Sequence, residues 1–166
     1  MSTNTTHVET PVSGVRPNGQ VDVRGPRFAA WITTAVLVAV LVVSVFSSVA
    51  AGVLLAVQAV VFAIGAVVGP RRSPYGRLFA VVVAPRLGPV TEREPEAPLK
   101  FAQLVGGIFA TVGVIGFFAG LPLLGTVATG FALFAALLNA AVGFCLGCQI
   151  YPLVARFRRS NPIAAA

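Results

Sequence analysis

The sequence predicts an all-α integral membrane protein, a four-transmembrane-helix bundle, from its composition and from two long uncharged stretches. Hydrophobic residues make up 57% of the 166 residues, charged residues only 10%, and the mean hydropathy is +0.89. Soluble domains carry about 25% charged residues, so this chain has too few charges to cover a water-facing surface. Residues 28–70 and 101–155 contain no Asp, Glu, Lys, Arg or His. One span needs about 20 apolar residues, so each stretch holds two.

Glycine and proline signals set the limits of the spans. Gly69-Pro70 ends the second span, and a turn around Pro122 precedes the fourth. We expect the fourth helix to end before Pro152, because the proline ring clashes with the Cys148 carbonyl and offers it no N–H donor. The spans expected on this basis are about residues 28–45, 50–68, 101–119 and 123–150.

The basic residues all lie on one side of this four-span arrangement. Both hairpin turns on the other side lack Lys and Arg, so the positive-inside rule places both termini and the central loop in the cytoplasm. The formal net charge of +7 is therefore a topology signal, and no nucleic-acid partner is expected. The twelve basic residues are Arg16, Arg24, Arg27, Arg71, Arg72, Arg77, Arg86, Arg93, Lys100, Arg156, Arg158 and Arg159.

The membrane domain is expected to cover residues 21–155, with a tail on each side and one long loop inside it. Residues 1–20 are polar without apolar periodicity, which is typical of a disordered tail, here cytoplasmic. Residues 156–166 form a basic cytoplasmic tail. The cytoplasmic loop 69–100 contains an apolar run, residues 78–84, that is too short to span a bilayer, so we expect it to lie in the membrane interface.

Two further questions of organisation stay open at the level of sequence. Ser48-Val49-Ala50 resembles a signal-peptide cleavage site, but the apolar segment before it is longer than the usual run of about 7–15 residues, which favours a retained first span. Small residues recur at helix-packing spacing in the second and third spans. They serve either a compact bundle or a homo-oligomer, and are Gly52, Ala56, Ala59, Ala63, Ala66, Gly106, Ala110, Gly113, Gly116 and Gly120.

Few residues within the spans are able to support chemistry. All Asp and Glu residues and the single histidine lie outside the spans, so a proton-coupled transporter is not expected. Two amides, Gln58 and Asn139, lie inside the predicted bundle. We expect them to form hydrogen bonds between helices, worth about 0.6 kcal/mol on average. The alternative is that they bind a small polar ligand or a quinone carbonyl.

The strongest candidate site is a CxxC pair, Cys145 and Cys148, the only cysteines in the chain. At helical spacing i, i+3 they share one face, close enough for a disulfide. Three interpretations compete: a redox dithiol, half of a metal site completed by a second chain, and two small buried hydrophobic residues. Redox use is the leading one, with no metal and no cofactor expected. In the reducing cytosol the resting form should be the dithiol.

Their expected position weakens the redox interpretation. A CxxC near the C-terminal end of the fourth helix would face the negative end of the helix dipole, which disfavours thiolate. Nearby cations would have to compensate, and Arg71, Arg72 and Arg156 are the candidates within reach.

Four segments together resemble a known family. They are Val-Asp-x-Arg-Gly-Pro-Arg-Phe-Ala-Ala (21–30), Gly-Pro-Arg-Arg-Ser-Pro-Tyr-Gly (69–76), Arg-Leu-Gly-Pro (86–89) and Phe-Cys-Leu-Gly-Cys-x-x-Tyr (144–151). The family is an uncharacterised bacterial, chiefly actinobacterial, four-span membrane family catalogued as domain of unknown function 4395. The resemblance covers about residues 20–155. It implies a multi-pass protein of the bacterial cytoplasmic membrane, with suspected partners among thioredoxin-like and sulfurtransferase proteins.

Two functions follow as hypotheses from different classes. The first is a thiol-disulfide redox or sulfur-handling membrane protein in which the cysteine pair faces the cytoplasm. The second is a non-catalytic membrane subunit or scaffold whose basic loop binds anionic lipid or a partner protein. In both cases the lipid bilayer is the first partner, and whether the protein is an enzyme stays undecided.

Overall fold

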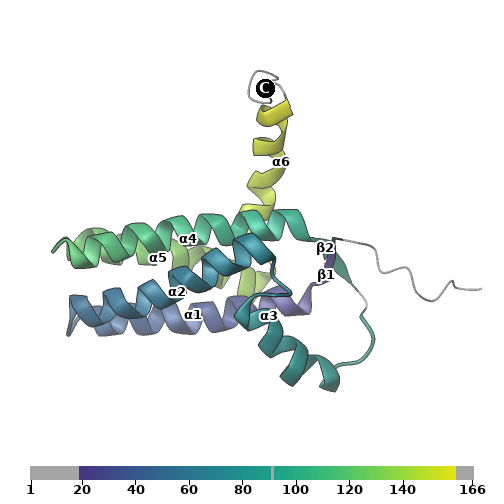
Figure 1. The fold of residues 1–166 in the computed structure, drawn as a ribbon, viewed down its shortest axis with the longest axis horizontal. Coiled ribbons are helices and arrows are strands. Elements are labelled where there is room, and N and C mark those ends of the chain that lie inside the picture. Colours follow the sequence, from purple (N-terminus) through teal and green to yellow (C-terminus); the bar gives the residue numbers. More distant parts are fainter. Residues whose placement is uncertain (1–18, 91, 160–166) are drawn as a thin grey trace, which may run out of the picture.

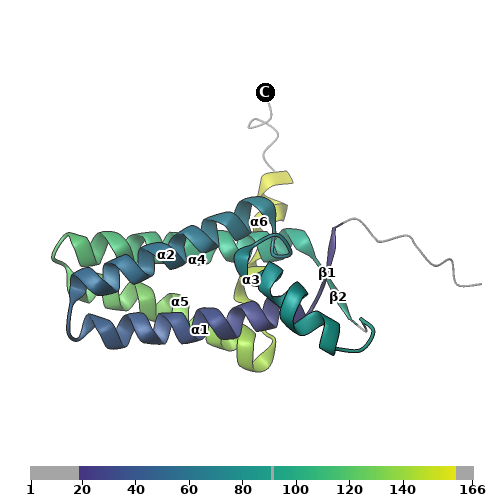
Figure 2. The ribbon, with the colours of Figure 1, turned by 60° about the horizontal axis from the view of Figure 1, so that its bottom comes forward.

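Four long helices form the body of the protein in a computed structural model that describes residues 19–90 and 92–159. Each is long and apolar enough to cross a membrane, in agreement with the predicted bundle of four such helices. They pack as a ring in the order α1, α2, α4, α5, with α5 returning to α1 (Figures 1 and 2). These helices are α1 (Arg24–Ser44), α2 (Ser48–Val68), α4 (Glu96–Phe118) and α5 (Pro122–Val142).

The bundle buries a narrow seam and exposes apolar side chains all around it. Leu37, Val40 and Leu55 are fully buried at the centre, whereas outward residues such as Val67 and Leu123 are 76% exposed. The exposed belt of valine, leucine, isoleucine and phenylalanine covers all four long helices. Water does not tolerate a continuous apolar surface of this size, so the fold is that of a multi-pass membrane protein.

Small residues allow the helices of the bundle to approach closely. A Cβ atom added to Gly116 would lie 2.6 Å from the backbone nitrogen of Gly125, and one added to Gly113 would lie 2.6 Å from the Leu55 side chain. Gly116 has no space for a methyl group, and one at Gly113 would require the Leu55 side chain to shift. Part of the small-residue pattern is therefore used inside the bundle, where close packing replaces the hydrophobic effect as the attraction between helices.

The segment between α2 and α4 is more ordered than the predicted loop 69–100. It holds α3 (Pro74–Leu78), a π-helical turn (Phe79–Val83) and a 3-10 turn (Ala84–Arg86), and α4 already begins at Glu96. Strands β1 (Gln20–Asp22) and β2 (Arg93–Pro95) pair antiparallel, which ties the start of α1 to the start of α4. Phe79 is buried against Phe28 of α1, with ring centroids 5.7 Å apart.

The buried amide Gln58 is bonded to this segment and not to another span. The Tyr75 hydroxyl donates to Gln58 Oε1 at 2.7 Å, so α3 folds back against the bundle. Burial raises the pKa of Tyr75 above its ordinary value, which keeps the phenol protonated as a donor. Among the described residues, none bonds to the buried Gln58 Nε2. The predicted hydrogen bond from Gln58 to another helix is therefore present, but its partner is the short helix α3 and not one of the spans.

The predicted fourth helix, residues 123–150, was too long. Helix α5 ends at Val142, and a separate helix, α6 (Leu146–Arg159), follows after a short turn. Pro152, expected to end the fourth helix, lies inside α6. Helix α6 runs across the bundle axis and leaves the ring of four, as Figures 1 and 2 show.

Removing the Tyr75 hydroxyl should destabilise the bundle. Tyr75→Phe leaves both polar atoms of the buried Gln58 amide unpaired, which costs about 1–3 kcal/mol. In a Gln58→Leu background the same change should cost much less, because no buried amide remains. Unfolding of detergent-solubilised protein by sodium dodecyl sulfate measures both effects. Equal losses in the two backgrounds would show that the hydrogen bond contributes nothing.

Candidate functional site

The cysteine pair lies where the chain turns from α5 into α6. Gly143 has φ +72°, a left-handed conformation that suits glycine, and this ends α5. The amides of Gly143 and Phe144 bond back to the carbonyls of Asn139 at 3.1 Å and Leu138 at 3.4 Å. The turn therefore satisfies its own backbone while changing direction, and Cys145 follows directly.

Cys145 caps the N-terminus of α6. Its carbonyl accepts from the Gln149 amide at 3.1 Å, the first hydrogen bond of the helix. Its sulfur accepts from the Cys148 amide at 3.3 Å, in the position where a serine or aspartate oxygen caps other helices. The sulfur of Cys145 thus meets a backbone donor at the positive end of a helix.

This arrangement removes the electrostatic argument against a reactive thiolate that the sequence suggested. The pair was expected near the C-terminal, negative end of a helix, but it occupies the N-terminal end of α6. A helix N-terminus carries a partial positive charge and free amides, both of which stabilise a thiolate. The pair therefore depends less on neighbouring arginines than the sequence indicated.

The two cysteines form a close pair with different surroundings. Their Cα atoms are 5.2 Å apart and their sulfurs are in disulfide contact. Cys145 is buried, with 9% of its surface exposed, whereas Cys148 is only partly buried. One sulfur therefore belongs to the interior of the protein and the other is nearer its surface.

The start of α6 is held against α4 by close packing. A Cβ atom added to Gly147 would lie 2.6 Å from both the Cα and the Cβ of Ala102, so only glycine fits. The rings of Phe101 and Tyr151 meet beside this contact, with centroids 6.0 Å apart. This packing stabilises a helix that contains a proline, whose ring costs about 3 kcal/mol in a helix interior.

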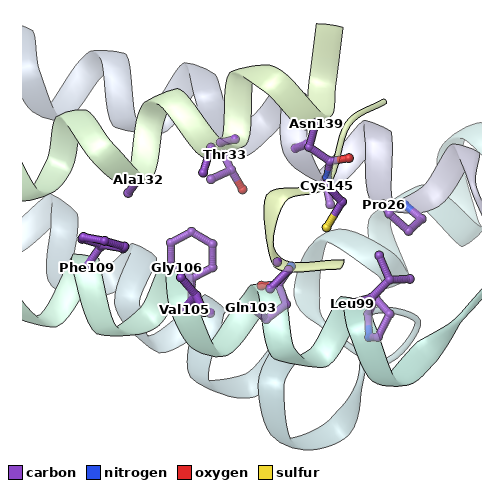
Figure 3. Close-up of a pocket in the computed structure, with 18 of the residues that line it drawn as sticks. Pro26, Thr33, Leu99, Gln103, Val105, Gly106, Phe109, Ala132, Asn139 and Cys145 are labelled. Carbon is purple, nitrogen blue, oxygen red and sulfur yellow. The ribbon is translucent and has the colours of Figure 1, made fainter. Parts of the chain in front are cut away.

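Cys145 faces a cavity of about 370 Å³ between α1, α4, α5 and the start of α6. Its sulfur points into this space in Figure 3, with Asn139 beside it and Gln103 on the opposite wall. The lining is mostly apolar and includes no charged side chain. It consists of Gly25, Pro26, Ala29, Ala30, Thr33, Phe62, Pro70, Ser73, Leu99, Ala102, Gln103, Val105, Gly106, Phe109, Phe131, Ala132, Phe134, Ala135, Ala136, Asn139, Cys145, Gly147 and Ile150.

Three polar side chains face the cavity without an internal partner. Within the described part of the chain, no hydrogen bond engages the side chains of Thr33, Gln103 or Asn139. Ser73 also lines the space, but its hydroxyl already donates to the Pro70 carbonyl at 2.7 Å. Thr33, Gln103 and Asn139 are therefore the groups able to bind a ligand's polar atoms.

Only some of the residues predicted from the sequence lie at the cavity. Asn139 lies beside Cys145 at the cavity, whereas Gln58 bonds to Tyr75 and is not among the lining residues. Arg71 and Arg72 are exposed on the turn whose Pro70 and Ser73 line the cavity.

Two further arginines lie on α6 and beside the turn that precedes Cys145. Arg156 is exposed, two turns along α6 from the pair. Arg27 was not singled out from the sequence, yet its guanidinium lies 4.0 Å from the point that a Cβ atom on Gly143 would occupy. A positive group from α1 therefore lies beside the turn that presents Cys145.

Sequence reasoning also missed Gln103 and Thr33 as cavity residues. Gln103 is a third amide in an otherwise apolar stretch, and the same argument that selected Gln58 and Asn139 would have found it. Thr33 gives no such signal, because threonine in a membrane helix usually bonds to its own backbone, as Thr34 does to the Ala30 carbonyl at 2.8 Å.

Fold and site together define a four-span helical membrane protein with a close cysteine pair at the N-terminus of an additional helix. Comparison with family models identifies the family: the chain belongs to the family described as Domain of unknown function (DUF4395), matched over residues 21–156. The match confirms the family resemblance of the sequence. No curated protein and no solved structure matches the chain significantly.

Gly147→Ala should move the cysteine pair away from the cavity. The new methyl group meets the Ala102 backbone, so the start of α6 has to shift, and Cys145 should react faster with a thiol reagent after reduction. Gly107→Ala is the matched control, because its Cβ atom would meet only the Phe62 Cβ at an ordinary 3.5 Å. Rates of maleimide labelling on reduced protein in detergent check this. Unchanged labelling in Gly147→Ala would contradict the close packing of α6 on α4.

Proposed function

We propose that this protein is a thiol-disulfide redox protein of the cytoplasmic membrane, in which Cys145 and Cys148 cycle between disulfide and dithiol. The observation that carries the proposal is the position of the Cys145 sulfur. It caps α6, accepts a hydrogen bond from the Cys148 amide at 3.3 Å and faces the cavity. A purely structural cysteine would not need a stabilised sulfur, a bonded neighbour and an adjoining space at once.

The different exposure of the two sulfurs gives the exchange a direction. A thiolate from a soluble dithiol attacks the more accessible Cys148 sulfur and forms a mixed disulfide, and the Cys145 sulfur leaves as a thiolate. The Cys148 amide and the helix N-terminus stabilise that thiolate. The partner's second thiol then displaces Cys148, so the partner becomes a disulfide and the cysteine pair gains two electrons and two protons.

The surrounding positive charge supports a partner that is anionic at the moment of attack. Arg27 lies beside the turn before Cys145, and Arg71 and Arg72 lie on the exposed turn next to the cavity. Arg156 continues the basic surface along α6. A thiolate from a thioredoxin-like protein, or a persulfide carried by a sulfurtransferase, would be attracted to such a surface.

Redox cycling of the pair is testable on the full-length protein. Membranes treated with diamide and then with dithiothreitol should show both cysteines protected from a maleimide-polyethylene glycol reagent in the first state and both labelled in the second. Cys148→Ser should leave Cys145 as a single, slowly labelled thiol, because the Cys145 side chain is buried. Cys145→Ser should give a single, rapidly labelled thiol and should trap mixed disulfides. A pair that stays labelled after diamide would rule out the redox role and favour a non-catalytic scaffold.

The proposal also requires that the pair faces the cytoplasm. The end of the bundle that carries β1, β2 and α3 is opposite the two hairpin turns (Figure 1), and all twelve basic residues fall outside those turns. A C-terminal fusion to green fluorescent protein should therefore fluoresce, and one to alkaline phosphatase should be inactive. Active phosphatase with a dark fluorescent fusion would reverse the topology and place the pair outside.

A further inference from the structure

We propose that the cavity beside Cys145 binds the ring of a lipid-soluble quinone, which accepts the two electrons of the Cys145–Cys148 dithiol. This inference rests on the proposed redox cycle and names the electron acceptor at the same site. It follows from where the cavity opens, from the chemistry of its walls and from the sulfur that lines it.

Part of the cavity wall belongs to the apolar outer surface of the protein. Phe131, Phe134 and Ile150 line the cavity, yet they are 58%, 56% and 45% exposed on the outside of the protein. The rim of the cavity therefore reaches an outer surface that is apolar on every long helix. A volume of about 370 Å³ lies within the range of small-ligand sites, about 300–1,000 Å³.

The walls select a neutral molecule with hydrogen-bond acceptors. None of the lining side chains is charged, and burying an unpaired charge among apolar groups is strongly unfavourable. The hydroxyl of Thr33 and the amide groups of Gln103 and Asn139 are donors without internal partners in the described structure. They project from three different helices, α1, α4 and α5 (Figure 3). Donors on opposite walls suit the two carbonyl oxygens of a flat quinone ring, whereas an acyl chain would leave all three unpaired.

The reactive sulfur belongs to the same cavity. Cys145 lines the space and its sulfur points into it (Figure 3), while Cys148 is partly exposed. In the proposed step the dithiol loses two electrons and two protons and forms the Cys145–Cys148 disulfide. The quinone gains the same two electrons and two protons and becomes a quinol, one per disulfide. Electrons therefore enter from a soluble dithiol at Cys148 and leave to the lipid-soluble acceptor at Cys145.

The test measures oxidation of the reduced, purified full-length protein by a decyl-substituted benzoquinone and by a short-chain naphthoquinone. Quinol absorbance and maleimide gel shifts are followed together, and one quinol should appear per disulfide. Ala135→Leu extends a lining residue of α5 into the cavity and should slow this reaction at least about tenfold. Ala141→Leu is the matched control, because Ala141 is exposed on the same helix. Diamide, a small soluble oxidant, should form the disulfide in all three proteins at similar rates.

The outcomes separate the two proposals. Oxidation by diamide but by neither quinone would overturn the quinone site and leave the redox cycle intact. Failure of diamide to form the disulfide would overturn the redox cycle itself. Equal quinone rates in Ala135→Leu and Ala141→Leu would show that the quinone reacts elsewhere.

A second variant covers the case in which Ala135→Leu does not fold. Asn139→Leu replaces the amide with an apolar side chain of similar size and so removes one donor to a quinone carbonyl. It should raise the quinone KM several-fold without changing the rate with diamide. A KM equal to that of the unmodified protein in this variant, for both quinones, would contradict the proposed ring position.

Discussion

Within a bilayer every backbone amide and carbonyl has to find a partner inside the protein, and the whole structure depends on this constraint. The four long helices meet it in the simplest way, through their own hydrogen bonds. Breaks in the helices occur only where another partner is supplied. The turn at Gly143 uses the carbonyls of Asn139 and Leu138, and the start of α6 uses the Cys145 sulfur. The cysteine pair is thus part of the means by which the chain leaves a membrane helix.

Close packing between small residues determines where that break can lie. Helices α4 and α5 approach at Gly116 and Gly125, and the start of α6 approaches α4 at Gly147. Because these residues have no side chain beyond hydrogen, α6 can cross the bundle next to α4 instead of extending α5. The cavity remains in the space that α6 does not fill. One packing pattern therefore both places the cysteines and leaves a space beside them.

The sequence alone predicts the four spans because lipid demands long apolar helices whatever their partners are. It predicted the fourth span poorly because Pro152 was taken as the stop. The actual stop is Gly143, which adopts a left-handed conformation, and the packing of α6 on α4 offsets the cost of a proline within a helix. The cavity was beyond reach for a different reason: Thr33 and Gln103 lie 70 residues apart in the chain. They line one cavity only because of the order and rotation of the helices around the ring.

The break between α5 and α6 also decides what the cysteines can do. Had one helix continued through residue 150, both sulfurs would have shared one face, one environment and the negative end of the dipole. The turn at Gly143 instead gives Cys145 a backbone donor and a place on the cavity wall, and leaves Cys148 nearer the surface. On the redox proposal, this difference between the two sulfurs would let the disulfide exchange with a soluble thiol at Cys148 and a lipid-soluble acceptor at Cys145. A straight helix could not provide that separation, so the redox proposal depends on a feature of the backbone more than on the CxxC motif itself.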